Sequence, residues 1–349
     1  MSDLAVVLFN LGGPDKPDAV EPFLYNLFSD PAIIGAPGFV RRPLARLISW
    51  RRARVAREIY AKIGGGSPIL ANTEAQARAL EKQLEARGLA AKVFIAMRYW
   101  HPFAAEAARA VAAYAPARIV LLPLYPQFST TTTESSLADW AQAARAAGIA
   151  AETRAVCCYP AERGFIAALA GMIRARLDRW SGPPPRLLFS AHGLPKKVIG
   201  RGDPYQWQVE RTAGAVAVAL ADALAGAAPD WVVCYQSRVG PLEWIGPSTD
   251  AEIRRAGADG VPVMVVPIAF VSEHSETLVE LDMVYRHLAE ASGVPHYERV
   301  PTVSAGSAFV DGLAGLVQTA LQRPAPMASE SGVRICPAEF KRCAMASGM

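Results

Sequence analysis

The chain has 349 residues, of which 52% are hydrophobic and 19% charged, a composition typical of globular proteins and unlike that of disordered chains. This length predicts two domains of about 100–200 residues each. The formal charge of +4, from 36 basic and 32 acidic residues, is too small to indicate nucleic-acid binding. No zinc-finger, RNP or helix-turn-helix signature is present either. We therefore expect no nucleic-acid partner.

The sequence also lacks the signals of export and of membrane insertion. Its first residues, MSDLAVVLFNLGGP, have neither the basic region nor the cleavage site of a signal peptide. No apolar run approaches the ~18 residues that a membrane-spanning helix needs. We expect a cytoplasmic or peripheral protein, whose five cysteines do not form a disulfide framework.

Short apolar runs alternate with longer amphipathic stretches along the chain, which predicts an α/β protein with mostly parallel sheets. Strands are expected at 4–10, 91–99, 117–125, 186–192, 230–237 and 261–270, and helices at 72–87, 134–147 and 206–226. In the first helix, Asn72 or Thr73 is the expected N-cap and Gly88 the residue after the C-cap. The expected domains are 1–155, which includes an apolar lip segment at 23–52, then 156–323, and then a cysteine-containing tail at 324–349.

Several predicted strands end in polar or glycine-containing loops, among them NLGGP, RYWHP, SAHGLP and YQSRVGP. The carboxyl ends of parallel strands meet at one edge, where open α/β proteins bind ligands. We therefore expect a cleft between the two domains. Neither NLGGP nor IGGGSP (63–68) completes a dinucleotide or P-loop fingerprint, so no nucleotide cofactor is expected.

The stretch FVSEHSETLVELD (270–282) concentrates carboxylates and an imidazole directly after an apolar strand. With ~100° per helical residue, Glu273, Glu276 and Glu280 fall within about 60° of one another, and His274 lies aside. One interpretation is a helix start with Ser272 as N-cap and acids in the first turn. That leaves Glu280 unexplained, since like charges one turn apart repel. The alternative is a site for a divalent cation or for protons.

His192 ends the predicted strand 186–192 in the motif SAHGLP. It could simply bond a carbonyl there, but α/β enzymes place their chemistry at strand ends, and histidine titrates near neutral pH.

Two further parts of the sequence each allow two interpretations. Residues 41–57 mix apolar residues with seven arginines, which suits either a lid or membrane-surface contact, or packing on the body. Cys157, Cys158, Cys336 and Cys343 could supply the four ligands of a [2Fe–2S] cluster, although consecutive strand residues face opposite ways.

Eight motifs together resemble ferrochelatases, in order and across nearly residues 3–320. They are LFNLGGP, IGGGSPI, MRYWHPF, LPLYPQFSTTTTESSL, FSAHGLP, GDPYQWQV, YQSRVGPLEWIGPSTD and VPIAFVSEHSETLVELD. The resemblance implies a lyase that inserts Fe²⁺ into protoporphyrin IX to form protohaem, the terminal step of haem biosynthesis. It implies two Rossmann-like, chelatase-like domains with parallel four-stranded sheets flanked by helices, and a porphyrin cleft between them.

The resemblance also implies roles for individual residues. His192 and Glu276 match the family's catalytic pair and candidate Fe²⁺ ligands, with Glu273 as a further candidate ligand. Glu273, His274 and Glu280 match a polar row that conducts protons or metal. The positions that match the porphyrin pocket are Arg98, Tyr99, Tyr125, Trp244 and Phe270. The lip at 23–52 implies peripheral contact with the inner face of the cytoplasmic membrane. Whether the chain forms a homodimer is left open.

The tail departs from the cluster-containing members of the family. It supplies only Cys336 and Cys343, and Met345 stands where a third tail thiolate is expected. Four ligands then require both Cys157 and Cys158, or a ligand that is not cysteine. The alternatives for function are a coproporphyrin ferrochelatase, a cobalt chelatase, and a non-catalytic porphyrin or metal carrier.

Overall fold

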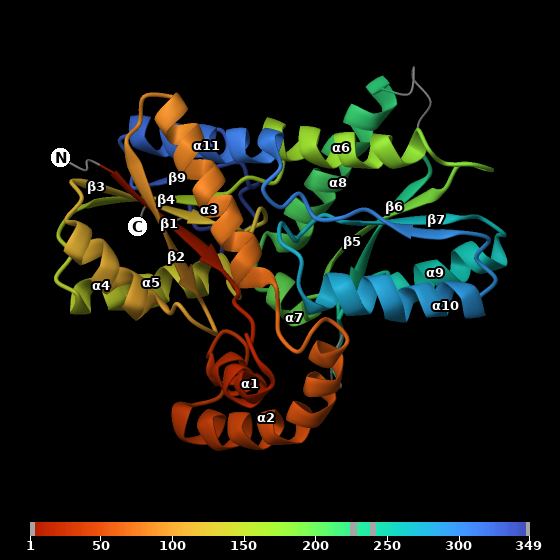
Figure 1. Ribbon diagram of the computed structural model, residues 1–349, viewed down its shortest axis with the longest axis horizontal. Helices are drawn as coiled ribbons and strands as arrows, with labels where there is room; N and C mark the ends of the chain where they lie inside the picture. The colour runs from red at the N-terminus through yellow and green to blue at the C-terminus, as the bar shows by residue number, and fades with distance from the viewer. Residues whose placement is uncertain (1–3, 224–228, 238–241, 347–349) are drawn as a thin grey trace. The chain divides into compact units, whose positions relative to one another are not determined.

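The computed structural model describes residues 4–223, 229–237 and 242–346, and the chain divides into two compact units (Figure 1). Unit 1 consists of Met1–Tyr125, Ser129–Cys157 and Ala314–Gly332. Unit 2 consists of Pro126–Phe128, Cys158–Leu313 and Val333–Met349. The division between Cys157 and Cys158 lies close to the expected end of the first domain at residue 155. The chain then re-enters unit 1 at Ala314, inside the range expected for the second domain.

Unit 1 is built on a five-stranded sheet of order β2-β1-β3-β4-β9. Its strands are β1 (Leu4–Asn10), β2 (Ala91–Met97), β3 (Arg118–Pro123), β4 (Glu152–Cys158) and β9 (Met327–Ser329). The pairs β1–β2, β1–β3 and β3–β4 are parallel, and every residue of β1 is buried, as a central strand covered on both faces requires. Helix α3 (Ile69–Ala86) lies on one face, and α4 (Ala104–Tyr114) and α5 (Thr133–Ala146) on the other (Figure 1). We expected four strands; β9, from the C-terminal segment, adds the fifth.

The lip segment of unit 1 is helical. The 3-10 turn η1 (Pro17–Ala19) leads into α1 (Val20–Ser29), and α2 (Gly38–Ala61) follows. The two helices pack together through a small apolar cluster that includes Phe23, Leu24 and Tyr60. The outer side of α2 keeps large apolar side chains exposed.

Unit 2 contains a four-stranded parallel sheet of order β6-β5-β7-β8. Its strands are β5 (Arg186–His192), β6 (Trp231–Gln236), β7 (Val263–Pro267) and β8 (Tyr297–Arg299). Helices α6 (Arg163–Leu177) and α8 (Tyr205–Ala223) lie on one face, and α9 (Thr249–Ala258) and α10 (Tyr285–Ala291) on the other (Figure 1). The short α7 (Lys196–Ile199) follows β5, the π-helix η2 (Glu276–Val284) precedes α10, and α11 (Ser307–Gln322) runs from unit 2 into unit 1. Residues 224–226, expected in the helix at 206–226, lie outside the described residues.

One predicted helix start is wrong. Helix α3 begins at Ile69 after Pro68, so Asn72 and Thr73 lie inside the helix and do not cap it. Their side chains instead donate to carbonyls four residues earlier. Asn72 Nδ2 donates to the Pro68 carbonyl at 2.9 Å, and Thr73 Oγ1 donates to the Ile69 carbonyl at 2.7 Å. The predicted end is confirmed, because Gly88 follows the C-cap with φ +76°, a conformation that favours glycine.

Candidate active site

The candidate catalytic side chains of unit 2 gather at the carboxyl edge of its sheet. His192 is the last residue of β5 and pairs in register with Gln236, the last residue of β6. Ser237 follows directly, and the segment after β7 leads into η2, which begins at Glu276. Parallel pairing therefore brings three strand ends to one edge, as expected for a ligand site in an open α/β sheet.

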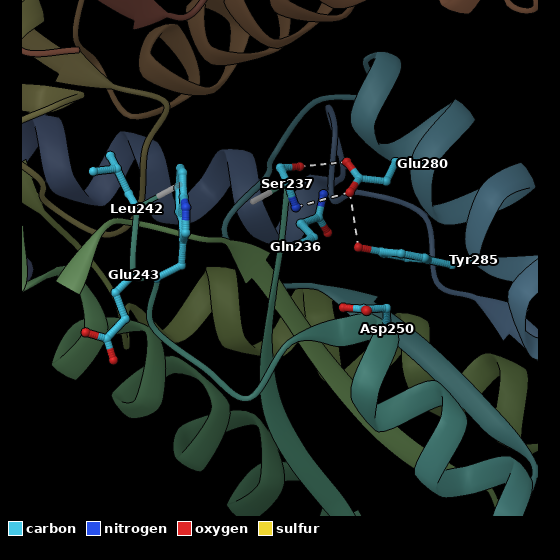
Figure 2. A pocket seen from close by; sticks show the side chains of 8 residues that line it. Gln236, Ser237, Leu242, Glu243, Asp250, Glu280 and Tyr285 are labelled. Carbon is cyan, nitrogen blue, oxygen red and sulfur yellow. Dashed lines mark hydrogen bonds between the residues drawn. The ribbon is translucent and has the colours of Figure 1, made fainter. Parts of the chain in front are cut away.

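A continuous hydrogen-bonded row starts at His192. Its Nδ1 lies 2.9 Å from Glu276 Oε2, and Ser237 Oγ lies 3.1 Å from the same oxygen. Ser237 Oγ also donates to Glu280 Oε2 at 2.6 Å, and the Tyr285 hydroxyl donates to Glu280 Oε1 at 3.1 Å. Figure 2 shows Glu280 held between Ser237 and Tyr285. The row thus runs from an imidazole through two carboxylates.

The two carboxylates differ in their electrostatics. Burial alone would raise the pKa of Glu276, but the adjacent His192 lowers it well below its ordinary value. Burial and the neighbouring Glu276 raise the pKa of Glu280. Burial alone would lower the pKa of His192, and Glu276 more than offsets this, so the pKa of His192 is raised. Because Glu276 is ionised, Nδ1 of His192 is the donor in their bond, and Nε2 is the nitrogen available to a ligand.

The helix that carries these carboxylates is a π-helix, which differs from the α-helix we expected. It spans Glu276–Val284, and its N-cap is Ser275. Ser272 is therefore not the cap; it is buried, and its carbonyl lies 3.1 Å from His274 Nδ1. The ~100° spacing assumed from the sequence does not hold for i→i+5 bonding, although Glu276 and Glu280 still reach the same hydroxyl. Such helices are rare and frequently occur at functional sites.

Glu273 lies before η2 and outside the row. Both of its oxygens lie within 3.1 Å of Arg299 Nη1, and the Thr302 backbone N–H donates to Oε1 at 2.9 Å. Arg299 also binds Asp282 through two 2.7 Å bonds. Burial would raise the pKa of Glu273, but Arg299 lowers it. Glu273 is thus a member of a buried ion-pair network rather than the neighbour of Glu276 that we expected.

His274 and Phe270 form an adjoining buried contact. Their ring centroids lie 4.6 Å apart, and the His274 side chain is buried. Burial lowers the pKa of His274, which keeps this imidazole neutral near pH 7. His274 therefore lies near Glu276 and His192 without carrying charge.

Beyond Glu280 the row reaches a pocket of about 550 Å³, which Figure 2 shows from close by. Trp244, predicted for the porphyrin site, lines it, and its buried indole N–H has no hydrogen-bond partner among the residues that the structure describes. The remaining lining residues are Gln236, Ser237, Leu242, Glu243, Asp250, Glu280 and Tyr285. Of these, only Glu280 was predicted besides Trp244. The motif YQSRVGP flagged the strand end that contains Gln236 and Ser237, but nothing in the sequence singled out either side chain.

In unit 1, the predicted residues Arg98 and Tyr99 contact an acid that the sequence did not indicate, and Arg98 also acts electrostatically on the predicted Tyr125. Arg98 Nη2 lies 2.8 Å from Asp30 Oδ2, and the Tyr99 hydroxyl donates to the same oxygen at 2.8 Å. Arg98 Nε donates to Ser135 Oγ at 2.8 Å. Burial raises the pKa of Tyr125, so its phenol stays protonated. Asp30 therefore orients Arg98 and Tyr99.

Three of the four candidate cluster cysteines converge in unit 2. The thiols of Cys158 and Cys343 hydrogen-bond to Cys336, which lowers the pKa of Cys336, and Gln208 Nε2 donates to its sulfur at 3.1 Å. All five cysteines are buried thiols that are not in disulfides. Cys157 precedes Cys158 on β4, so its side chain points to the other face of the strand.

These cysteines do not by themselves fit a [2Fe–2S] cluster, which takes four ligands. Cys158, Cys336 and Cys343 supply three, and Met345 offers no thiolate as the fourth. Within the described ranges, no set of three or more His, Cys, Asp or Glu side chains has an arrangement that could hold a metal ion. No described helix is long and apolar enough to cross a membrane.

Comparison with solved structures identifies the fold. The fold is similar to that of SirB from Bacillus subtilis with Fe³⁺, with a TM-score of 0.54 and 11% identity over 92% of this chain and 96% of that one. It is also similar to the sirohydrochlorin chelatase SirB from Bacillus subtilis subspecies spizizenii in complex with cobalt, with a TM-score of 0.52 and 12% identity over 92% and 97% of the two chains. At these identities the likeness establishes the fold, that of the chelatases.

Sequence comparison identifies the family. The Ferrochelatase family model matches residues 3–321. The chain is 57% identical over 349 residues to the ferrochelatase of Caulobacter vibrioides, covering 99% of this chain and 98% of the relative. It is 55% identical over 348 residues to that of Phenylobacterium zucineum, with the same coverage of 99% and 98%. The chain belongs to the ferrochelatase family, lyases that insert iron into protoporphyrin in haem biosynthesis. The predicted family and fold class are confirmed.

Proposed function

We propose that His192 is the base of this ferrochelatase and that Glu276 orients it. Metallation replaces two pyrrole N–H protons of protoporphyrin IX by Fe²⁺, so the site must remove two protons for each iron inserted. The observation that carries the proposal is the 2.9 Å contact between His192 Nδ1 and Glu276 Oε2. It fixes the tautomer that leaves Nε2 free to accept a proton. Glu280, two contacts further along, takes the proton onward.

Steady-state metallation assays of His192→Ala test this role. A base acts on the chemical step, so kcat should fall by a factor of about 10²–10⁴ while KM for Fe²⁺ stays nearly constant. If His192 instead ligates the incoming iron, KM for Fe²⁺ should rise in the variant as kcat falls. Circular dichroism of the variant checks that the fold is intact. Retained turnover would remove His192 from the mechanism.

We further propose that Arg98, Tyr99 and Tyr125 of unit 1, and Trp244 and Phe270 of unit 2, contact the porphyrin. What supports this for Trp244 is its buried indole N–H, which lies in the wall of a pocket and has no partner within the described part of the chain. Trp244→Phe keeps the apolar ring and removes the N–H. Its KM for protoporphyrin should rise severalfold with kcat nearly unchanged, and an unaltered KM would exclude a contact through that group.

The substrate pair is tested directly against its alternatives. Protoporphyrin IX and coproporphyrin, each with Fe²⁺ or Co²⁺, should be compared at equal concentrations. The highest kcat/KM is expected for protoporphyrin IX with Fe²⁺. Stoichiometric porphyrin binding without metallation would favour a carrier instead. Sedimentation velocity in the same buffer determines whether the chain is a monomer or the homodimer that the family leaves open.

We propose that the protein sits peripherally on the inner face of the cytoplasmic membrane through α2. Phe39 and Trp50 are 81% and 65% exposed on this helix, which also carries arginines. Apolar side chains interleaved with cations suit an anionic lipid surface. Binding to vesicles that contain phosphatidylglycerol should fall at least tenfold in a Phe39→Ser, Trp50→Ser double variant. Binding to purely zwitterionic vesicles should be weak for both proteins, and equal binding of both proteins to anionic vesicles would exclude α2.

A [2Fe–2S] cluster requires a fourth ligand that is not one of the three converging cysteines. We infer that the tail of this chain binds a cluster only if such a ligand, from another residue or a small molecule, completes the set. Anaerobic purification tests this: charge-transfer bands in the visible spectrum and about two irons per chain would establish the cluster. Their absence would assign the three thiols a structural role in holding the tail.

A further inference from the structure

Ser237 has an unusual backbone conformation directly after β6. Its φ is +61°, and among the described residues only Ala115 and Ser304 share a positive φ without being glycine. This left-handed region is unfavourable for a residue with a side chain, and such strain persists where the surrounding structure enforces it. Strained residues cluster at functional sites, so the contacts of Ser237 need an explanation.

The left-handed turn aims both polar groups of Ser237 at Glu280. The backbone N–H donates to Glu280 Oε1 at 3.1 Å, and Oγ donates to Glu280 Oε2 at 2.6 Å. Two donors on two oxygens fix both the position and the plane of the carboxylate (Figure 2). An extended backbone at this position would turn one of these groups away.

The same hydroxyl also joins Glu280 to the catalytic pair. Ser237 Oγ lies 3.1 Å from Glu276 Oε2, the oxygen that contacts His192. Gln236 approaches Glu276 as well, at 3.4 Å, but its other amide atom accepts from Ser190 Oγ. A hydroxyl carries one hydrogen and two lone pairs, so it can pass a proton between two carboxyl groups while neither moves.

We propose that Ser237 is a positioning residue for iron insertion: it holds Glu280 in place and connects it to Glu276, so that pyrrole protons leave through Glu276, Ser237 and Glu280 into the adjacent pocket. The pocket contains Glu280 and Tyr285 in its wall, which gives the protons a route to solvent. This inference rests on the proposed role of His192 as the base. No covalent bond to Ser237 forms; each proton that Oγ accepts from one carboxyl group is matched by one that it donates to the other.

Two substitutions separate the hydroxyl from the backbone. Ser237→Ala and Ser237→Gly both remove Oγ and keep the N–H, but glycine tolerates the positive φ and alanine does not. If the hydroxyl matters, both variants should lose about 10- to 100-fold in kcat, with KM for porphyrin within twofold of the wild type. Their melting temperatures should differ, with Ser237→Gly the more stable. Wild-type kcat in Ser237→Gly would overturn the proposal, because only the turn would then matter.

A double-mutant cycle with Glu280→Gln tests the connection itself. If Ser237 acts through Glu280, Ser237→Ala should add less than threefold to the loss in kcat caused by Glu280→Gln. Multiplicative losses would show that Ser237 acts elsewhere and would overturn the proposal. Ser304→Ala is a matched control, since Ser304 also has a positive φ and should keep wild-type kcat. Failure of the wild type to insert iron would contradict the function of the chain, whereas failure of the cycle contradicts only the role of Ser237.

Discussion

The ion pair between Glu273 and Arg299 gives the sharpest test of how the acidic residues are divided. The sequence grouped Glu273 with Glu276 and Glu280, but the structure pairs it with Arg299, whose side chain is 7% exposed. We predict that Glu273→Gln destabilises the fold and leaves turnover within about threefold of the wild type. Glu280→Gln should do the reverse, with a small change in stability and a large loss of turnover.

The magnitude follows from the contacts that are lost. Removing one partner of a buried ion pair costs about 3–5 kcal/mol, because the other charge is left uncompensated. Arg299 retains two 2.7 Å bonds to Asp282 in the variant, so the cost should lie below that range, at about 2–3 kcal/mol. For a unit of this size, that lowers the melting temperature by roughly 4–12 °C.

Acid should reduce the difference in stability between the wild type and Glu273→Gln. Arg299 lowers the pKa of Glu273 below its ordinary value of 4.5, so the pair stabilises the fold above pH 4.5 and loses this contribution as the pH falls through the lowered pKa. Thermal unfolding followed by circular dichroism at several pH values measures the difference, and a porphyrin metallation assay measures turnover. An unchanged melting temperature together with a tenfold loss of kcat would refute our reasoning and return Glu273 to the chemistry.

Three further predictions concern other parts of unit 2. Because Glu276 raises the pKa of His192 above 6.5, kcat/KM should rise with pH, with a midpoint above pH 6.5. Glu276→Gln should move this midpoint to lower pH. An unchanged midpoint in pH–rate profiles would contradict the pairing. Gly164→Ala should destabilise the protein by about 1–3 kcal/mol, since a Cβ there would lie 2.3 Å from a backbone oxygen of α11. Gly171→Ala in the same helix meets open space and should stabilise the protein slightly. Urea unfolding measures both changes. Cys336→Ser should loosen the tail, so that limited trypsin digestion cuts it faster than in the wild type; equal rates would show that the thiol contacts do not hold it.

The strands that the sequence predicted best are those buried on both faces. The ranges 4–10 and 186–192 match β1 and β5 because continuous apolar runs bounded by polar loops leave little choice of limits. Other strands escaped prediction for identifiable reasons. The first half of β4 is exposed and polar, and β8 and β9 have three residues each, too few for a periodic pattern.

The sequence indicated candidate site residues but little of their geometry. His192, Glu276 and Glu280 stand in recognisable motifs, and they come together. The partners of the other polar residues lie far along the chain: Arg299 is 26 residues from Glu273, and Tyr99 is 69 residues from Asp30. Single-sequence patterns carry no information at such separations. The role of Ser237 was equally hidden, because a positive φ is not expected of serine.

The row itself explains why two carboxylates can lie so close together. Glu276 and Glu280 would repel each other in an isolated helix. His192 donates to the first through Nδ1 and becomes a cation beside it on accepting a proton, whereas Ser237 and Tyr285 give the second neutral donors. The environment therefore pushes their pKa values apart: down at Glu276 and up at Glu280. Pairs of acids separated in this way usually divide the work of proton transfer. Here a proton is held less tightly beside the imidazole and more tightly beside the pocket, which is the direction that our proposed route requires of a proton taken from the porphyrin.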